Sequence, residues 1–298
     1  MKMMKIVENK KIFFAISIIA VLISVISLLT LGLNRGIDFT SGTLFTLEVP
    51  AGVTASNIDD FISTSEVAAD LNITSARVQG IGENQVSVRV PSLTPEEQNI
   101  FLDSLEGEFG EIHSLGIDQV DAIVGKELTK NAIISVILGC IGILIYVGFR
   151  FEFRFAVAGV LCLAQDVMVT IGLIVLIRQE VNSGFIVALL TIVGYSINNT
   201  IIIYDRLREN LKMGKYKDDK KLLVNTSISE TLGRTINTAA TTLVAIIALV
   251  VFGSASIRDL TLSMVIGIVA GTFSSVFLAT PLWYVMSGGE KKAANFKK

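Results

Sequence analysis

Six long apolar runs constrain this chain more than any other feature of its sequence. They occupy residues 12–33, 132–149, 155–177, 185–204, 236–252 and 260–286. Each is close to the length that an α-helix needs to cross about 30 Å of hydrocarbon. Because 51% of the 298 residues are hydrophobic and only 17% are charged, the composition excludes an ordinary soluble protein. The sequence predicts an α-helical membrane protein with six transmembrane helices.

The distribution of Lys and Arg predicts how these helices are oriented. Basic residues stay preferentially on the cytoplasmic side, and with the N-terminus inside most of the 25 Lys and Arg residues fall in inner segments. The first run follows Lys10 and Lys11 and lacks a small-residue cleavage site, so we expect residues 1–33 to hold a retained anchor helix. Both termini are expected in the cytoplasm, with residues 205–235 as a cytoplasmic loop and residues 287–298 as a cytoplasmic tail.

Residues 34–130 separate the first apolar run from the five helices expected within residues 131–286. Alternating apolar residues predict strands at 43–49 and 85–90, and two further strands are expected at 73–81 and 115–124. Helical spacing occurs at 56–71 and 95–109, the second opened by Thr94 as N-cap and Pro95 at the first helical position. The order βαββαβ predicts a small ferredoxin-like α+β domain, which the basic-residue distribution places outside the cytoplasm.

Asp166 places a carboxyl group near the middle of the third run. About eleven residues at 1.5 Å each put it about 16 Å deep in the bilayer. An ionised group there costs about 2.5 to 3.5 kcal/mol on insertion scales, so it needs a partner or a proton. Either Asp166 is a hydrogen-bonded structural acid between helices or it lines an ion route.

The fourth run carries the sequence GYSINNTIIIYDR at residues 194–206. Asn198 and Asn199 lie about 9 to 10 Å from its cytoplasmic end. Because an amide in hydrocarbon is unfavourable without a hydrogen-bond partner, either helix pairing or an ion-related role explains the two asparagines. We interpret Asp205 and Arg206 as the cytoplasmic boundary of this helix.

A polar stripe enters the fifth run from the same side. Arg234, Thr238 and Thr241 recur at four- and three-residue steps, and Asn237 lies four residues before Thr241. Arg234 either snorkels to lipid phosphates or faces a polar partner. The stripe of hydroxyl groups behind it favours the partner.

Several function classes are excluded by what the sequence lacks. A net charge of −2 and the absence of basic runs interleaved with aromatic residues give no site for nucleic acid. Cys140 and Cys162 both lie in apolar runs without a CxxC motif, so neither a metal site nor a disulfide is expected. No catalytic Ser/His/Asp set, phosphate-binding glycine loop or HExxH motif occurs, and we expect no enzyme and no organic cofactor.

Motifs at the ends of the runs resemble those of the SecF family, the smaller of two paired membrane subunits that assist bacterial protein export and relatives of the RND transporters. The matching segments are residues 36–43 (GIDFTSGT), 123–132 (IVGKELTKNA), 149–156 (FRFEFRFA), 164–167 (AQDV), 193–210 (VGYSINNTIIIYDRLREN), 231–238 (TLGRTINT) and 252–259 (FGSASIRD). They occur in the family's order, so the resemblance covers nearly the whole chain.

This resemblance implies an accessory subunit in the bacterial inner membrane that pairs with a SecD-like subunit near the SecYEG channel. The outer domains of this family grip or ratchet the unfolded preprotein, and ion flow through the membrane part drives them without covalent catalysis. Gly36 and Gly42 flank Asp38 in the first matching motif. Because glycine permits sharp backbone turns, we expect this motif to act as a hinge that couples the first helix to the outer domain.

Two residues depart from the family pattern. Asn199 stands where the family usually has an acid, and Gln165 stands where it usually has a His. Because an asparagine amide does not exchange protons in this range, a SecD-like partner carries the ion-binding acid alone, or Asp166 takes over, or the coupling ion is Na⁺ instead of H⁺. The predicted ion-coupling layer consists of Asp166, Gln165, Asn198, Asn199, Arg234 and Thr238.

Two other functions remain as alternatives. A self-contained RND-type exporter of small molecules or lipids normally has two six-helix halves, whereas this chain supplies one half and a domain of under a hundred residues. A non-conducting scaffold that stabilises a membrane complex would need no ion-linked residues. Drug or lipid transport by this chain alone would favour the exporter. For the scaffold, substitutions in the polar layer would alter the abundance of the partner but not the dependence on the ion gradient.

Overall fold

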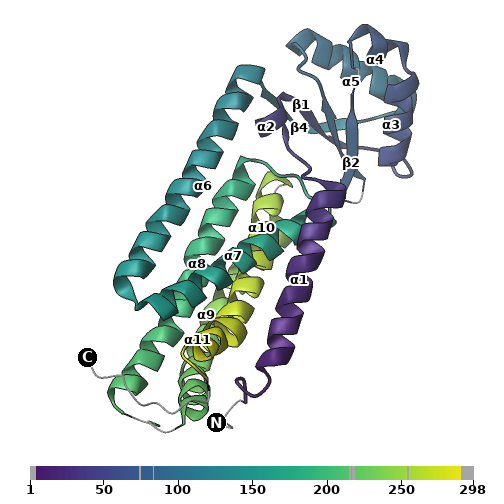
Figure 1. The fold of residues 1–298 in the computed structure, drawn as a ribbon. Helices are drawn as coiled ribbons and strands as arrows, with labels where there is room; N and C mark the ends of the chain where they lie inside the picture. Colours follow the sequence, from purple (N-terminus) through teal and green to yellow (C-terminus); the bar gives the residue numbers. More distant parts are fainter. Residues whose placement is uncertain are drawn as a thin grey trace. The chain divides into compact units, whose positions relative to one another are not determined.

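The computed structural model describes residues 5–73, 75–82, 84–214, 216, 219–253 and 255–289. Residues 290–298 of the predicted cytoplasmic tail lie outside this description. The chain divides into two compact units, residues 35–134 and the remainder. We call the larger one the membrane unit and the smaller one the α/β unit, and describe each by itself (Figure 1).

Among the described residues, six helical segments are long and apolar enough to cross a membrane. They are α1 (Lys10–Leu31), α6 (Ala122–Arg150), α7 (Phe153–Leu176), α8 (Ser183–Lys212), α9 (Lys220–Phe252) and a composite segment, Ile257–Met286. The composite segment contains most of α10 (Ala255–Ser274), the π-helix η1 (Ser275–Ala279) and α11 (Thr280–Met286). The prediction of six membrane-spanning helices therefore agrees with the structure in number and order.

The helices of the membrane unit differ in how deeply they are buried. Half of the most apolar window is buried in α7, in α8 and in the composite segment, against 17% in α1 and α9 and 6% in α6. Close approach depends on glycine: a Cβ at Gly172 of α7 would lie 2.1 Å from the Cβ of Ser24 in α1, and one at Gly271 of α10 would lie 2.9 Å from the Cβ of Ser196 in α8. Small residues thus let these backbones pack closely, as membrane helices commonly do.

The connection between α8 and α9 is shorter than the predicted loop over residues 205–235. Helix α8 continues to Lys212 and α9 already begins at Lys220, capped by the Asp219 side chain, which accepts from Leu222 N. The two extensions are joined by side-chain bonds, including Asn210 Nδ2 to Ser227 Oγ at 3.0 Å. These bonds stabilise helix where the sequence, with its many charged residues, indicated a loop.

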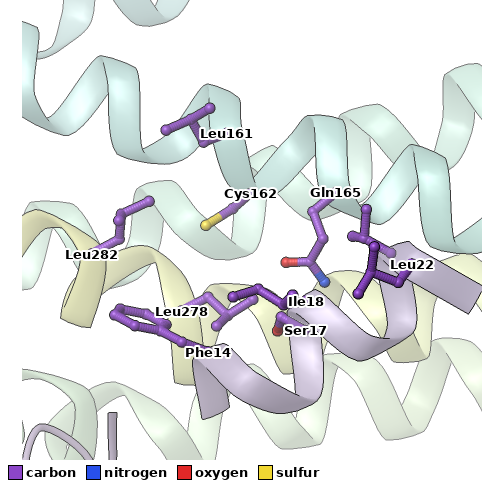
Figure 2. A pocket seen from close by; sticks show the side chains of 10 residues that line it. Phe14, Ser17, Ile18, Leu22, Leu161, Cys162, Gln165, Leu278 and Leu282 are labelled. Carbon is purple, nitrogen blue, oxygen red and sulfur yellow. The ribbon is translucent and has the colours of Figure 1, made fainter. Parts of the chain in front are cut away.

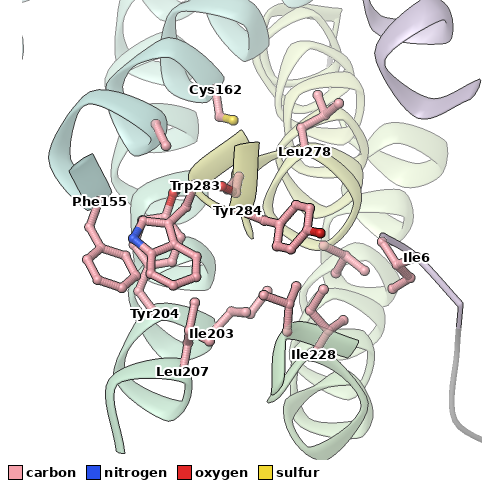
Figure 3. Packing of buried hydrophobic residues seen from close by; sticks show 14 of the residues in the cluster. Ile6, Phe155, Cys162, Ile203, Tyr204, Leu207, Ile228, Leu278, Trp283 and Tyr284 are labelled. Atoms are coloured by element: carbon pink, nitrogen blue, oxygen red, sulfur yellow. Dashed lines mark hydrogen bonds between the residues drawn. The ribbon is translucent and has the colours of Figure 1, made fainter. Parts of the chain in front are cut away.

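An aromatic cluster lies where α8 and α11 pack against α7 in the membrane unit (Figure 3). The rings of Phe155 and Trp283 stack with centroids 4.8 Å apart, and Tyr204 meets Phe155 edge-on at 5.0 Å. Ile6 and Val7 of the N-terminal segment are buried in the same cluster.

The α/β unit contains one antiparallel sheet covered by helices. Its elements are α2 (Ile37–Thr40), β1 (Gly42–Glu48), α3 (Ala55–Thr64), α4 (Glu66–Asp70), β2 (Arg77–Gly82), β3 (Gln85–Val90), α5 (Pro95–Phe109) and β4 (His113–Val120). The strand order is β2-β3-β1-β4, and each neighbouring pair is antiparallel. The start of α6 also belongs to this unit.

Two predicted strands need correction. The strand expected at 73–81 begins only at Arg77, and the strand expected at 115–124 runs from His113 to Val120. The second error arises because residues 122–124 (AIV) are apolar and β-branched enough to read as strand, whereas α6 starts at Ala122. Gly125 N donates to Asp121 O at 2.8 Å and closes the first helical turn.

The core of the α/β unit lies between the sheet and its helices. Phe45 of β1 and Phe101 of α5 are fully buried, with ring centroids 5.3 Å apart. Strand β4 contributes no residue to this core, and its Leu115 and Ile117 are 50% and 39% exposed. The sheet is therefore packed at its centre and open along β4.

Helix α5 begins with the predicted cap. Thr94 Oγ1 accepts from Glu97 N, while the Glu97 carboxylate accepts from Thr94 N at 2.7 Å. This reciprocal pair is a capping box, with Pro95 at the first helical position. Hydrogen bonds from the backbone and hydroxyl of Thr94 lower the pKa of Glu97.

Candidate functional site

Asp166 is the only fully buried acidic residue among the residues that the structure describes. It lies on α7, where α8 and α10 pack against that helix. Its Oδ2 accepts two hydroxyl hydrogen bonds, from Ser196 Oγ of α8 at 2.5 Å and from Ser274 Oγ of α10 at 2.7 Å. Three helices therefore meet at one carboxylate oxygen.

The second oxygen of this carboxyl group has a different environment. Within the described chain, Asp166 Oδ1 is buried and accepts no hydrogen bond. An unpaired oxygen on a buried carboxylate is unfavourable unless a proton or a cation compensates it. The geometry thus fits a group that exchanges a proton or binds a small cation.

Hydroxyl groups continue the polar layer beside Asp166. Ser275 Oγ and Thr200 Oγ1 lie 2.9 Å apart, and Ser275 Oγ also donates to Gly271 O at 2.7 Å. Thr170 Oγ1 donates to the backbone oxygen of Asp166 at 2.7 Å. The buried polar layer of this structure consists of Asp166, Thr170, Ser196, Thr200, Ser274 and Ser275.

A helical irregularity borders this layer. The π-helix η1 begins at Ser275, directly after Ser274, and Pro281 follows two residues beyond its end. Because proline lacks an N–H, it leaves a carbonyl of the preceding turn without its helical partner, and such irregularities often occur at functional sites. Tyr204 Oη donates to Ala279 O at 3.1 Å and so satisfies one carbonyl of η1.

The two asparagines of α8 face in different directions. Asn199 is fully buried, and neither its Oδ1 nor its Nδ2 has a hydrogen-bond partner in the described part of the chain. Asn198 is exposed. No hydrogen bond joins either amide to Asp166 among the described residues, so the structure brings only Ser196 and Thr200 from this motif into the layer.

Gln165 lies next to Asp166 on α7 but points to a different neighbour. It is partly buried and lines two cavities together with Ser17 of α1. Gln165 therefore belongs to the contact between α1 and α7, on a face of α7 distinct from the one that presents Asp166.

The predicted polar stripe of α9 faces outward. Arg234, Asn237 and Thr241 are exposed and Thr238 is half-buried, whereas Thr235 between them is fully buried. Thr238 Oγ1 and Thr241 Oγ1 donate to backbone carbonyls of their own helix. The structure does not bring Arg234 or Thr238 to Asp166, and leaves the stripe available to a partner.

The residues at the end of α8 are held by ion pairs. Asp205 accepts from Arg150 Nη2 at 2.9 Å, and Arg206 Nε donates to Glu230 of α9 at 2.7 Å. Arg206 also pairs with Glu209 one turn further on. These contacts fix α6, α8 and α9 together at one end of the bundle.

The glycine motif forms a compact elbow within the α/β unit. Gly36 precedes α2, whose first turn contains Asp38, and Gly42 opens β1. Gly42 has φ +125°, and a Cβ there would lie 2.5 Å from Val90 O, so only glycine fits. Gly42 is thereby fixed in the sheet, whereas Gly36 has an ordinary extended backbone conformation, and the hinge role of this motif stays a prediction.

The described residues contain no group of three or more His, Cys, Asp or Glu side chains that could hold a metal ion. A sodium ion has a different requirement, since hydroxyl, carbonyl and carboxylate oxygens are ligands for hard cations. Asp166 Oδ1 and the hydroxyl groups of Ser196 and Ser274 supply oxygens of this kind.

Ser196 and Ser274 are site residues that sequence reasoning missed. The repeat of Gly267, Gly271 and Ser275 indicates close packing, and the structure shows it between α8 and α10. Ser274 directly precedes Ser275, the last residue of that repeat. Two adjacent serines inside an apolar run are the signal that could have indicated Ser274.

Comparison with known proteins places this geometry in a family. The model of the protein export membrane protein SecD/SecF C-terminal region matches residues 101–289, and that of the SecD/SecF GG motif matches residues 26–49. The protein translocase subunit SecF of Sebaldella termitidis is 38% identical over 286 residues, which is 95% of this chain and 92% of the relative. SecF of Alicyclobacillus acidocaldarius is 34% identical over 293 residues, which is 97% of this chain and 94% of that relative.

Solved structures agree with the sequence relatives. The crystal structure of SecDF, a translocon-associated membrane protein from Thermus thermophilus, matches with a TM-score of 0.86 and 32% identity. The match covers 96% of this chain and 39% of that one. The predicted resemblance is thereby confirmed: the chain is a multi-pass membrane protein and belongs to the SecF family of protein-export membrane proteins.

Proposed function

We propose that this chain is the SecF-type accessory subunit of the bacterial Sec translocase, which pairs with a SecD-like subunit and uses an ion gradient to promote preprotein translocation. The observation that carries the ion-linked part is the carboxyl group of Asp166, with one oxygen bound by Ser196 and Ser274 and the other unpartnered among the described residues. Protonation or cation binding at the free oxygen would change the bonding between α7, α8 and α10. No covalent chemistry is needed, so the protein is not an enzyme.

Relatives support a SecD-like partner. The protein translocase subunit SecDF of Bacillus subtilis is 32% identical over 96% of this chain, which spans only 38% of that relative. In such relatives the counterpart of this chain is one part of a longer polypeptide. The remainder of that polypeptide indicates which kind of protein this chain would need beside it.

Two exposed surfaces fit such a partner. The α9 stripe of Arg234, Asn237 and Thr241 is costly against lipid, because polar groups in hydrocarbon need partners. In the α/β unit, the open strand β4 exposes Leu115 and Ile117. A SecD-like subunit would cover the stripe. It would also supply an ion-binding acid, which this chain does not have at position 199.

The sheet order β2-β3-β1-β4, with helices between β1 and β2 and between β3 and β4, supports a ferredoxin-like fold for the α/β unit. We assign it to the outer side of the bacterial inner membrane, with both chain termini in the cytoplasm, because basic residues concentrate at the opposite helix ends. There it would act on the unfolded preprotein that leaves the SecYEG channel. The outer domain that we propose comprises the whole α/β unit, residues 35–134.

Transit of a preprotein into inverted membrane vesicles tests this function. Vesicles with this chain and its SecD-like partner should import faster when an ion gradient is present, and Arg234→Met should abolish the gain. Restoring an acid with Asn199→Asp and comparing proton with sodium gradients separates the coupling ions. Export that ignores the gradient in the parent vesicles would exclude ion coupling and favour a scaffold.

A self-contained exporter of small molecules or lipids is the second candidate. It is favoured only by the kinship of the family to RND transporters. Copurification of a SecD-like protein supports the accessory subunit, whereas drug or lipid transport by this chain alone would support the exporter.

A further inference from the structure

A groove in the membrane unit lies between α1, α7 and the segment formed by η1 and α11. It holds a cavity of about 410 Å³ (Figure 2). Phe14 and Ser17 line it from α1, Leu161 and Gln165 from α7, and Leu282 from α11. The lining is apolar except for Ser17, Gln165 and the thiol of Cys162. A volume of this size lies within the range of ligand pockets.

The mouth of this groove opens toward lipid. Ile18, Leu22 and Leu161 line the cavity and are 59%, 54% and 53% exposed. On a membrane-spanning helix, large exposed aliphatic side chains contact hydrocarbon. A hydrocarbon chain can therefore enter the groove sideways from the bilayer, and its burial there is favourable because the walls are apolar.

Basic residues continue the groove at one end. Lys10 lies four residues before Phe14, and Lys11 lies seven residues before Ile18, so both share the face of α1 that lines the cavity. Arg154 lies seven residues before Leu161 on the matching face of α7. Lys10 and Lys11 thus lie in the first turn of α1, and Arg154 lies in the first turn of α7.

Two of these cations have a neighbour that is not a carboxylate: an aromatic ring for Lys10 and a lysine for Arg154. Lys10 Nζ lies 5.0 Å from the centroid of the Tyr284 ring in α11. Lys220, whose Nζ donates to Ser287 O at 2.9 Å, lies within electrostatic range of Arg154. In the described part of the chain, no ion pair joins Lys10, Lys11 or Arg154 to a carboxylate.

Two acidic residues lie next to these cations in the sequence. Glu8 accepts a hydrogen bond from Asn225 Nδ2 at 2.9 Å, and Glu152 is the N-cap residue of α7. Positive charge therefore predominates at the rim of an apolar groove. This combination of a basic rim and an acyl-sized channel complements a molecule with a negative headgroup and a hydrocarbon tail.

We propose that this groove binds an anionic phospholipid, with one acyl chain in the cavity and the phosphate among Lys10, Lys11 and Arg154. The guanidinium of Arg154 can bind two phosphate oxygens at once, and the lysines add positive charge at the level where headgroups lie. Deeper in the groove, the acyl chain covers the apolar faces of α1 and α7. The site is independent of Asp166 and of the proposed function.

Retention of lipid by the purified full-length protein tests the proposal. The protein, with any subunit that copurifies, is exchanged into mixed micelles of phosphatidylglycerol and phosphatidylcholine, and bound lipid is counted by native mass spectrometry. We expect preference for phosphatidylglycerol, and a loss of at least about three-fold in the triple variant Lys10→Gln, Lys11→Gln, Arg154→Gln. Lys212→Gln removes an exposed cation elsewhere and should retain the parent's preference.

A second variant tests the groove without changing charge. Leu161→Trp fills the mouth and should lower bound phosphatidylglycerol to a similar degree, whereas Leu249→Trp adds the same ring at an exposed site on α9 that lines neither cavity. Equal binding of phosphatidylcholine, or equal loss in Lys212→Gln, would overturn the role of the basic rim. Displacement of the lipid by excess inorganic phosphate alone would overturn the role of the acyl chain.

Discussion

The membrane unit contains two polar regions that sequence reasoning joined and the structure separates. Around Asp166, hydroxyl groups of α8 and α10 converge on a buried carboxylate, and the helices supply the partners from within the chain. On α9, the side chains of Arg234 and Asn237 are exposed, and no described residue forms a hydrogen bond with either side chain. The first region is assembled by this chain alone, while the second is complete only with a partner. Substitutions in the first region should therefore impair gradient-dependent export, and substitutions in the second should impair binding of the partner.

The largest effect is expected from breaking the buried layer. In the double variant Ser196→Ala, Ser274→Ala, Asp166 loses both hydroxyl donors, and an unsatisfied buried carboxylate costs more than the lost bonds alone. We expect gradient-dependent export to fall by roughly ten-fold, which corresponds to about 1.4 kcal/mol. Vesicle import at fixed gradient measures it, with Thr191→Ala on α8 as a control, because the exposed Thr191 hydroxyl donates to Val187 O of its own helix. Unchanged import in the double variant would show that the layer is not used.

A substitution in the exposed stripe of α9 should weaken binding of the SecD-like subunit. Arg234→Met keeps an unbranched side chain but removes its charge and its N–H donors, so the SecD-like subunit should copurify about three- to ten-fold less, by about 0.7 to 1.4 kcal/mol. The amount of this chain in the membrane should stay constant, because the Arg234 side chain is exposed and no described residue forms a hydrogen bond with it. Quantitative immunoblotting of the purified complex measures both. Equal copurification would place the stripe against lipid instead.

Packing between the buried helices offers a test of moderate size. A Cβ at Gly271 would lie 2.9 Å from Ser196, so Gly271→Val should force α8 and α10 apart and cost about 1 to 3 kcal/mol. Gly142→Val on the exposed α6 meets nothing within 4 Å and serves as the matched control. Thermal unfolding in detergent should separate the two variants. Equal midpoints would indicate that α8 and α10 do not pack as closely as described.

The smallest effect is expected at the cap of α5. The pKa of Glu97 is lowered in the folded state, so its stabilising contribution is present above its unfolded pKa and is lost as pH falls through the folded value. Resistance of the α/β unit to protease should therefore fall with acidification more in the parent than in Glu97→Gln. Glu106→Gln, at the far end of the helix, should behave like the parent. An identical pH profile for the parent and Glu97→Gln would contradict the capping role.

Sequence reasoning anticipated the features that depend on local pattern. Six apolar runs became six helices, and Thr94 with Pro95 marked the start of α5, because length, hydropathy and capping are encoded within a few residues. The helical extensions between Asp205 and Arg234 were missed because bonds such as Arg206 to Glu230 join residues distant in sequence. These contacts exist only after the two helices have packed.

The candidate site was predictable to a similar extent. Asp166 stands out in any apolar run, and its burial follows from the cost of exposing a carboxylate to lipid. Which hydroxyl groups reach it depends on the rotation of α8 and α10, which the close approach at Gly267 and Gly271 fixes. The same rotation turns Asn198 outward while Asn199 stays inside, a difference of one residue that periodicity alone does not resolve.

The most direct test of ion coupling through the buried layer is import of a preprotein by inverted vesicles, measured with and without an ionophore, in the parent and in Asp166→Asn. Asparagine preserves the size of the side chain and one oxygen for Ser196 and Ser274 but exchanges no proton and carries no charge. We predict that the ionophore slows the parent and has no effect on Asp166→Asn, which imports at the slower rate throughout. An Asp166→Asn protein that imports at the parent's rate and remains sensitive to the ionophore would contradict the account.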